Sequence, residues 1–270
     1  MFGLLSAGRL AEYLARPLPP EALLVFLHIP KTAGSSITTD LARLFAPYRN
    51  IAPDYTDASR PFEQREAEAL ARFAAEAPTR RPRSASGHYH LRRLRPLLRG
   101  LEPLAFASMV RDPVARVVSD YRYMTSERHP DWRQARARFP TLDDYLAHPV
   151  SAEKMARYLL ADPRMPPDEI PGFLDETYHA LGAVEEYELS SYLLFALGGH
   201  RTVSTARERV AADGPTRREA LPPSLIERIA AANPRDAAIH AHVSAALARC
   251  KPAWLALREE APPTAAPGPA

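Results

Sequence analysis

The stretch "FLHIPKTAGSSITTDLARLF", residues 26–45, decides the fold that this sequence predicts. It begins inside an apolar run, residues 22–27, which is bounded by prolines and is typical of a central parallel strand covered on both faces. It ends in a predicted helix that starts at Ser35 or Ser36 and stops before Pro47. The apolar positions of that helix recur at helical spacing: Ile37, Leu41, Leu44 and Phe45. The sequence therefore predicts a strand, a short polar loop and a helix.

The polar loop has the chemistry of an anion site. A helix N-terminus presents free backbone N–H groups and the positive end of its dipole, and Gly34 lets a ligand approach the backbone closely. Lys31 adds a full positive charge in the same turn. Hydroxyl donors are also present: Thr32, Ser35 and Ser36. The alternative interpretation is a tight turn with an N-cap serine and an incidental lysine.

The same order of elements recurs further along the chain. Residues 104–110 form a second apolar run, followed by "RDPVARVVSDYRYM". There Asp112 is placed to cap a helix, Pro113 suits its first position, and an apolar stripe follows. A third short strand in "LGAV", residues 181–184, leads into a helix that stops at Gly198. Strands that alternate with helices predict an α/β fold with a central, mostly parallel sheet and a ligand at the carboxyl ends of its strands.

The remaining segments are interpreted more simply. Residues 61–77 are expected to be helical, and "SASGHYH", residues 84–90, to hold the end of a strand. "SERHPDWRQARARFP" is interpreted as a polar connection, and "TLDDYL" after it as a capping box that starts a helix. "NPRDAAIHAHVSAALARC" predicts a last helix capped by Asn233.

Length and composition fit one large domain with short appendages. The chain has 270 residues, of which 46% are hydrophobic and 25% charged, as in a soluble globular protein. We expect an amphipathic segment over residues 1–20, an α/β domain over residues 21–252 and a disordered Pro/Ala-rich tail over residues 253–270. Charged residues interrupt the N-terminal segment, so neither a signal peptide nor a membrane span is expected. Cys250 is the only cysteine, which excludes an intrachain disulfide and fits a cytoplasmic location.

The loop departs from the nucleotide-binding P-loop, G-x-x-x-x-G-K-[ST]. In that motif lysine follows the last glycine and a hydroxyl holds Mg²⁺, whereas here Lys31 precedes Gly34 and no earlier glycine stands in the loop. The sequence therefore predicts a phosphate site built in another order and working without a metal.

Two motifs resemble one known family. "FLHIPKTAGSS", residues 26–36, resembles the 5′-phosphosulfate loop of sulfotransferases that use 3′-phosphoadenosine 5′-phosphosulfate (PAPS), and "VRDPVARVVSDY", residues 110–121, resembles their 3′-phosphate motif. The nearest resemblance is to the carbohydrate sulfotransferases of family 2, the type that includes the heparan sulfate O-sulfotransferases and many bacterial members. It implies a P-loop-like three-layer α/β fold with a central, mostly parallel sheet flanked by helices.

The resemblance also implies roles for individual residues. Lys31 would contact the 5′-phosphosulfate and its bridging oxygen, and Arg111 and Ser119 would hold the 3′-phosphate. The rest of the 5′ cradle would come from the residues that follow the lysine: Thr32, Ala33, Gly34, Ser35 and Ser36.

The expected catalytic base is a histidine in "SGHYHL", residues 86–91. His88 follows Gly87 as the catalytic histidine follows glycine in heparan sulfate 2-O-type relatives, and neutral imidazole suits the role. His90 remains an alternative base, because it would share a face with His88 in an extended segment, and His88 could instead be a buried structural histidine. Two histidines without a third ligand make a poor zinc site, so no metal is expected.

The resemblance thus implies an enzyme that moves a sulfuryl group in line from PAPS to a hydroxyl of a carbohydrate or glycan-like acceptor and leaves 3′,5′-adenosine bisphosphate. No nucleic acid or membrane partner is expected. Anionic acceptors are included because arginines cluster in mid-chain, where their guanidinium groups could bind acidic groups. These arginines can equally form a solvated surface. They are Arg92, Arg93, Arg95, Arg128, Arg133, Arg136 and Arg138. Two alternatives remain, namely a P-loop kinase with an altered loop, which needs ATP and Mg²⁺, and an inactive polyanion-binding module.

Overall fold

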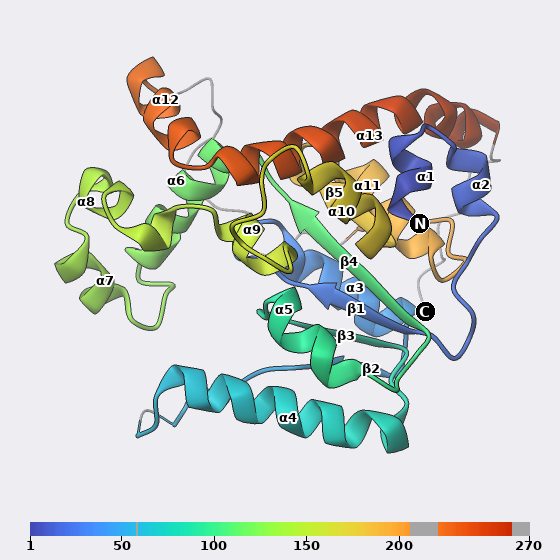
Figure 1. Ribbon diagram of the computed structural model, residues 1–270, viewed down its shortest axis with the longest axis horizontal. Coiled ribbons are helices and arrows are strands. Elements are labelled where there is room, and N and C mark those ends of the chain that lie inside the picture. The colour runs from blue at the N-terminus through green and yellow to red at the C-terminus, as the bar shows by residue number, and fades with distance from the viewer. Residues whose placement is uncertain (58, 206–220, 261–270) are drawn as a thin grey trace, which may run out of the picture.

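A five-stranded parallel sheet forms the centre of the protein (Figure 1). The computed structural model describes residues 1–57, 59–205 and 221–260, and within them the strand order is β2-β3-β1-β4-β5. The strands are β1 (Leu23–Leu27), β2 (Tyr48–Asn50), β3 (Ser84–Gly87), β4 (Leu104–Val110) and β5 (Ala180–Ala183). Every residue of β1 is buried, as expected for a central strand with both faces covered. The predicted α/β fold with a parallel central sheet is confirmed.

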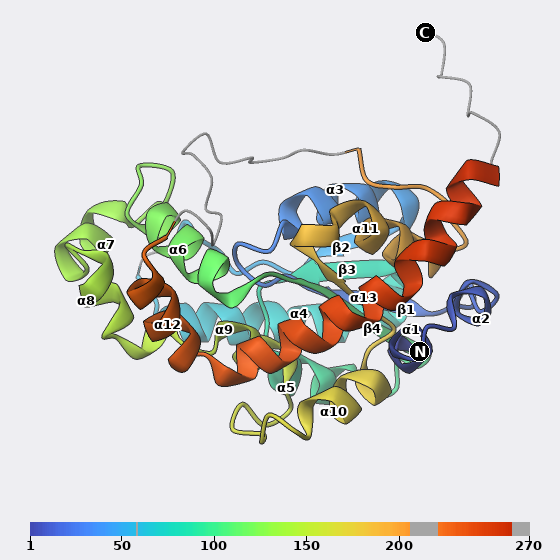
Figure 2. The same cartoon turned by 90° about the horizontal axis from the view of Figure 1, so that it is seen from above.

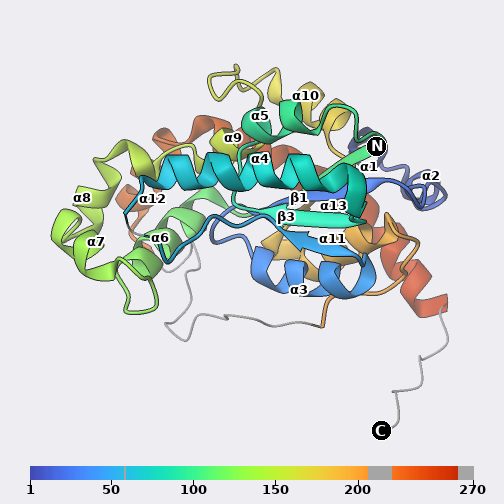
Figure 3. The same cartoon turned by 90° about the horizontal axis from the view of Figure 1, so that it is seen from below.

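Helices cover both faces of this sheet, which makes three layers (Figures 2 and 3). On one face lie α3 and α11, and on the other lie α5, α9 and α10, with α4 on the β2 side and α13 along β5. The helices are α1 (Phe2–Ser6), α2 (Leu10–Leu14), α3 (Gly34–Leu44), α4 (Phe62–Arg80), α5 (Leu91–Leu94), α6 (Pro113–Met124), α7 (Trp132–Arg138), α8 (Leu142–Leu146), α9 (Lys154–Leu159), α10 (Ile170–Thr177), α11 (Tyr187–Ala196), α12 (Pro223–Ala231) and α13 (Pro234–Glu260). Short 3₁₀ turns add η1 (Arg95–Leu98), η2 (Pro149–Ser151) and η3 (Val184–Glu186).

The strand register brings several loops together at one edge of the sheet. Leu27, the last residue of β1, pairs with Gly87, the last residue of β3, and with Ser108 of β4. Val110 of β4 pairs with Ala183, the last residue of β5. Because all these strands are parallel, the segments that follow them emerge side by side at the carboxyl edge. This edge carries the two motifs singled out in the sequence.

A separate lobe projects beyond the carboxyl edge. It consists of α6, α7, α8 and α12 (Figure 1), and a second hydrophobic cluster fills its interior. The buried members of that cluster are Val114, Val117, Val118, Phe139, Tyr145 and Ile229. The predicted cap of α6 is confirmed, since the Asp112 carboxylate accepts the N–H of Ala115 at 2.9 Å. The capping box at Thr141 is likewise confirmed.

A buried polar network fastens this lobe to α13. Arg116 is fully buried, and its guanidinium lies 3.3 Å from the carboxylate of Asp120 and 3.8 Å from that of Asp236. Asp236 also accepts the N–H groups of Met155 and Ala156, at 3.1 and 2.8 Å, and so caps α9. Buried charges persist when they are paired, and here the ion pair between Arg116 and Asp236 joins residues more than a hundred positions apart, while the hydrogen bonds of Asp236 add α9 to the network.

Two expectations about local structure were wrong. The arginine-rich segment interpreted as a polar connection contains α7, because arginine, glutamine and alanine are good helix formers and Ala135 is buried against the lobe. The last helix does not stop at Cys250, because α13 continues past Pro252 to Glu260 and buries Trp254 beside Tyr192. The predicted tail therefore cannot begin at residue 253, and residues 261–270 lie outside the described part of the chain.

The N-terminal segment forms two short helices rather than one. Phe2, Leu5, Leu10 and Tyr13 are buried from α1 and α2, so the amphipathic character expected for residues 1–20 is present. Within the described ranges, the structure contains no helix that is both long enough and apolar enough to cross a membrane.

Candidate active site

The loop between β1 and α3 holds an unusual backbone conformation. Lys31 and Ala33 have positive φ angles of 71° and 60°, although neither is glycine, and Thr32 between them does not. Alternating backbone conformations of this kind turn successive N–H groups into a concave array that suits an anion. Left-handed backbone costs an L-residue about 1–2 kcal/mol, and such strain concentrates at functional sites. The backbone conformation of this loop therefore supports a functional role, such as anion binding, in addition to its role as a connection.

The cradle residues differ in exposure. Thr32 is fully buried and its hydroxyl donates to the carbonyl of Ile29 at 2.9 Å, so this side chain helps to close the loop. Its place in the 5′ cradle stays a prediction. Ser36 is also nearly buried, at 4% exposed, while Ser35 is half-buried in the first turn of α3. Helix α3 begins at Gly34, one residue before the predicted start.

Lys31 reaches across to the lobe. Its Nζ lies 4.3 Å from the centroid of the Tyr123 ring, in the last turn of α6. A cation over an aromatic face is attracted electrostatically by the ring quadrupole. Sequence reasoning did not single out Tyr123, since only the fold brings the end of α6 back to the loop.

His88 lies directly after β3 and is oriented by the loop. Its Nδ1 is 2.7 Å from the backbone carbonyl of His28. A carbonyl only accepts hydrogen bonds, so the Nδ1 atom carries the hydrogen and the neutral ring keeps its lone pair on Nε2. The imidazole of His28 packs on that of His88, with ring centroids 4.2 Å apart. One face of His88 is therefore held, and its Nε2 is the nitrogen suited to accept a proton.

His28 is a second residue that sequence reasoning missed, although it stands within the quoted stretch. A Cβ atom on Gly34 would lie 2.1 Å from the His28 ring, so glycine at this position leaves room for the ring rather than for the ligand alone. The packing of His28 links the start of α3 to the predicted base.

His90 occupies a different environment from His88. Its ring packs edge-on against Tyr158, with centroids 4.7 Å apart, and its buried Nδ1 has no hydrogen-bond partner. Burial, with help from the nearby guanidinium groups, lowers the pKa of His90 to about 4. His90 is therefore a neutral packing residue here, which favours His88 among the two candidate bases. Across the described ranges, no cluster of three or more His, Cys, Asp or Glu side chains is placed to hold a metal ion.

Arg111 connects the second motif to the loop. It follows β4, is half-buried, and donates from Nη1 to the carbonyl of Lys31 at 3.3 Å. Burial lowers the pKa of Arg111, and the carboxylates of Glu185 and Asp112 act in the opposite direction. Ser119 belongs to the same motif, lies on α6, the helix that starts two residues after Arg111, and is 7% exposed. The fold thus places Lys31, His88 and Arg111 at one edge of the sheet, as the sequence predicted.

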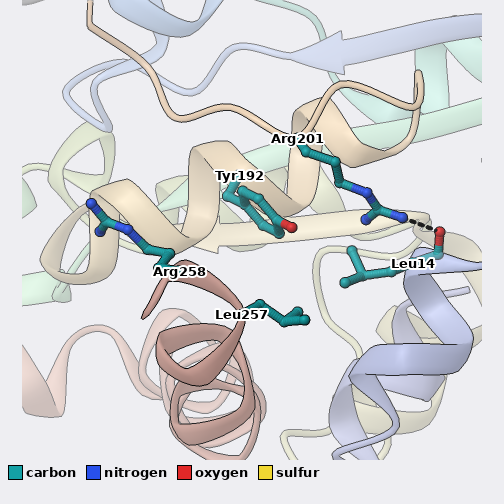
Figure 4. A pocket seen from close by; sticks show the side chains of 5 residues that line it. All are labelled: Leu14, Tyr192, Arg201, Leu257 and Arg258. Atoms are coloured by element: carbon teal, nitrogen blue, oxygen red, sulfur yellow. Dashed lines mark hydrogen bonds between the residues drawn. The ribbon is translucent and has the colours of Figure 1, made fainter. Parts of the chain in front are cut away.

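A cavity elsewhere in the protein has a different character. Leu14, Tyr192, Arg201, Leu257 and Arg258 line it (Figure 4), and it lies near α2, at the opposite end of the sheet from α6. Arg201 donates to the Leu14 carbonyl at 2.6 Å, and Arg258 pairs with a carboxylate at 2.7 Å. Both guanidinium groups are thus engaged within the protein, so this cavity is a poor candidate for the anion site.

The structure also contains a Ser–His–Asp grouping that is not a catalytic triad. His242 uses the same ring nitrogen, Nε2, toward Ser6 at 3.2 Å and toward Asp175 at 2.8 Å. A triad needs the serine and the carboxylate on opposite ring nitrogens, so this cluster joins α1, α10 and α13 structurally.

Sequence comparison identifies the family of this fold. The model described as "Sulfotransferase family" matches residues 19–163, more than half of the 270 residues, and the chain therefore belongs to the sulfotransferase family. The match includes Lys31, His88 and Arg111. A search of curated proteins found none that matches this chain.

One prediction tests whether the loop is strained. Ala33→Gly is expected to raise the free energy of unfolding by about 1 kcal/mol, because glycine adopts the left-handed backbone without steric cost, and to raise Tm by roughly 2–4 °C. Thermal unfolding by calorimetry measures this. The matched control is Ala71→Gly, on the exposed side of α4, where the same change should lower Tm because glycine weakens a helix interior. Equal destabilisation by both variants would mean that Ala33 is not strained.

Proposed function

We propose that this protein transfers the sulfuryl group of PAPS to a hydroxyl of a carbohydrate or related acceptor. The observation that carries the proposal is the meeting of the Lys31 loop, His88 and Arg111 at the carboxyl edge of the sheet. Family membership supports sulfuryl transfer in general, while the donor and the acceptor are our inference.

The hydrogen-bond donors and cationic groups at this edge suit the 5′-phosphosulfate and the 3′-phosphate of PAPS. Backbone N–H groups of the loop and of α3, together with the Lys31 ammonium, offer positive potential for the 5′-phosphosulfate. Arg111 offers a guanidinium fork for the 3′-phosphate, with Ser119 as a second donor from α6. PAPS would supply an activated sulfuryl group on its 5′-phosphate, and none of these residues requires a metal to act.

The chain's own residues have separable tasks. His88, with Nε2 as the unprotonated nitrogen, would accept the proton of the acceptor hydroxyl as the oxygen attacks. Lys31 would stabilise the negative charge that develops on the leaving phosphate. Fixed placement of both groups favours in-line transfer, as in phosphoryl transfer.

The acceptor would approach past the lobe. Helix α7 exposes several arginines there, and the guanidinium groups of Arg133 and Arg136 lie 4.6 and 5.1 Å from the ring of Trp132. An aromatic ring flanked by cations suits a sugar face that carries acidic groups, which is why we include anionic glycans among the acceptors. We propose a cytoplasmic location on the basis of the single cysteine alone.

The first experiment compares nucleotides. Thermal-shift titration with 3′,5′-adenosine bisphosphate should stabilise the protein by about 2.7 kcal/mol at a hundred times the dissociation constant. Stabilisation only by ATP with Mg²⁺ would instead favour a kinase. Binding of the bisphosphate without sulfuryl transfer from PAPS to any acceptor in a glycan panel would favour an inactive polyanion-binding module.

Arg111→Ala provides the test of the 3′-phosphate assignment. We expect affinity for 3′,5′-adenosine bisphosphate to fall about 10–100-fold and affinity for AMP to change less than about twofold, since a charged hydrogen bond contributes about 1.5–3 kcal/mol. Isothermal titration calorimetry with both ligands measures this. The control is Arg99→Ala, because Arg99 is exposed and precedes β4 at the other end of the same strand. An equal loss of affinity for both ligands would show that Arg111 does not bind the 3′-phosphate.

A further inference from the structure

A carboxylate lies beside the proposed 3′-phosphate subsite. Val110 of β4 pairs with Ala183 of β5, so the residues two positions later, Asp112 and Glu185, emerge next to each other. The Oε1 atom of Glu185 accepts the backbone N–H of Asp112 at 2.9 Å, at the N-cap of α6. Its Oε2 atom lies 3.3 Å from Nε2 of His240 on α13.

This carboxylate remains charged at neutral pH. Burial works to raise the pKa of Glu185, but its hydrogen bonds with His240 and with the backbone N–H of Asp112 outweigh that effect and lower the pKa. The same carboxylate is the leading electrostatic influence that favours the charged form of Arg111. The Glu185 carboxylate therefore lies at the N-terminus of α6 beside Arg111, where an anionic ligand is proposed to bind.

We propose that Glu185 is the counter-ion of the 3′-phosphate subsite and sets how tightly a 3′-phosphorylated nucleotide is held. This inference rests on the proposed function. Without nucleotide, Glu185 fixes the start of α6 and balances Arg111. With nucleotide bound, the Glu185 carboxylate and the 3′-phosphate both lie near Arg111 and repel each other. The repulsion weakens binding and so speeds release of the bisphosphate product, which carries the same 3′-phosphate as the donor.

The adjacent residue supplies a matched control. Glu186 has the same charge and belongs to the same 3₁₀ turn, but its carboxylate pairs with Lys251 of α13 at 2.8 Å. Glu185→Gln and Glu186→Gln therefore make the same chemical change one residue apart. Glutamine keeps an oxygen that accepts the Asp112 N–H, and the Glu185 side chain is 42% exposed, so both variants should fold.

Calorimetric titration of the full chain with 3′,5′-adenosine bisphosphate and with AMP is the test. In Glu185→Gln the bisphosphate should bind about tenfold more tightly, which corresponds to about 1.4 kcal/mol, and AMP should bind as in the unaltered protein. Displacement of bound bisphosphate by excess unlabelled ligand should show slower bisphosphate release. Glu186→Gln should leave the affinity for both ligands unchanged.

The outcomes separate this inference from the proposed function. If the unaltered protein prefers the bisphosphate to AMP but Glu185→Gln leaves that preference the same or reduces it, Glu185 is not the counter-ion and the proposed function stands. If Glu185→Gln strengthens both ligands equally, its effect does not pass through the 3′-phosphate and the inference is overturned. If the unaltered protein shows no preference for the bisphosphate, the 3′-phosphate subsite itself is refuted.

Discussion

Lys31→Ala is expected to lower the rate of sulfuryl transfer about 10²–10³-fold, the usual loss when a preorganised electrostatic group is removed from a reacting centre. The ammonium is the only lysine charge at the loop, and the loop's N–H groups are dipoles that cannot replace a full charge. A single-turnover assay with radiolabelled PAPS measures the chemical step directly. Lys31→Arg should recover part of the rate, because it keeps the charge in a different shape.

The control for Lys31 is Lys251→Ala. Lys251 lies on α13, is 43% exposed at its side chain and pairs with Glu186, so its removal should leave transfer unchanged. If Lys31→Ala retained full activity, the leaving-group role would be wrong. If it lost nucleotide binding and transfer to the same extent, Lys31 would be a binding residue without a part in the chemical step.

His88→Ala is expected to lower transfer about 10²–10⁴-fold while 3′,5′-adenosine bisphosphate still binds. The histidine follows β3, whereas the cradle follows β1, so removing the imidazole should spare the nucleotide site. Transfer to a panel of glycan acceptors and bisphosphate titration, made on the same preparation, measure the two effects separately.

Two further variants separate a base from a structural histidine. His88→Asn places an amide N–H where Nδ1 now donates to the His28 carbonyl, so the loop should keep its form while the base is absent. His90→Gln changes the residue packed on Tyr158 and should keep most of the transfer activity. Recovery of transfer in His88→Asn, or loss of nucleotide binding in His88→Ala, would make His88 structural.

Local sequence patterns predicted those parts of the fold that depend mainly on residues close together in the chain. The apolar run of β1, the boundaries of β4, and the cap of α6 at Asp112 each depend on neighbouring residues, and the structure has all three. Helix α7 was missed because its sequence is polar on most sides and only Ala135 is buried. The extension of α13 was missed because proline predicts a stop, while burial of Trp254 stabilises a further turn.

The place of the candidate residues was predictable, but their contacts were not. Lys31, His88 and Arg111 could be named because of the family resemblance of their motifs and because each was expected near the end of a strand, while their roles stay predictions. The packing of His28 on His88 and the hydrogen bond from the Asp112 N–H to Glu185 join residues 60 and 73 positions apart. Such pairs leave no periodic signal in the chain, and only the parallel register of the strands brings them together.

The network around Arg116 shows that the recognisable part of the sequence is smaller than the unit that folds. The family match ends at residue 163, yet Arg116 within it lies beside the carboxylate of Asp236, far outside. A fragment cut at that boundary would also lose β5, the neighbour of β4 in the sheet. The region that matches the family is therefore shorter than the region that must fold together. If the matched region were exchanged between relatives, the core would be preserved only if the segment that carries β5 and α13 were exchanged as well.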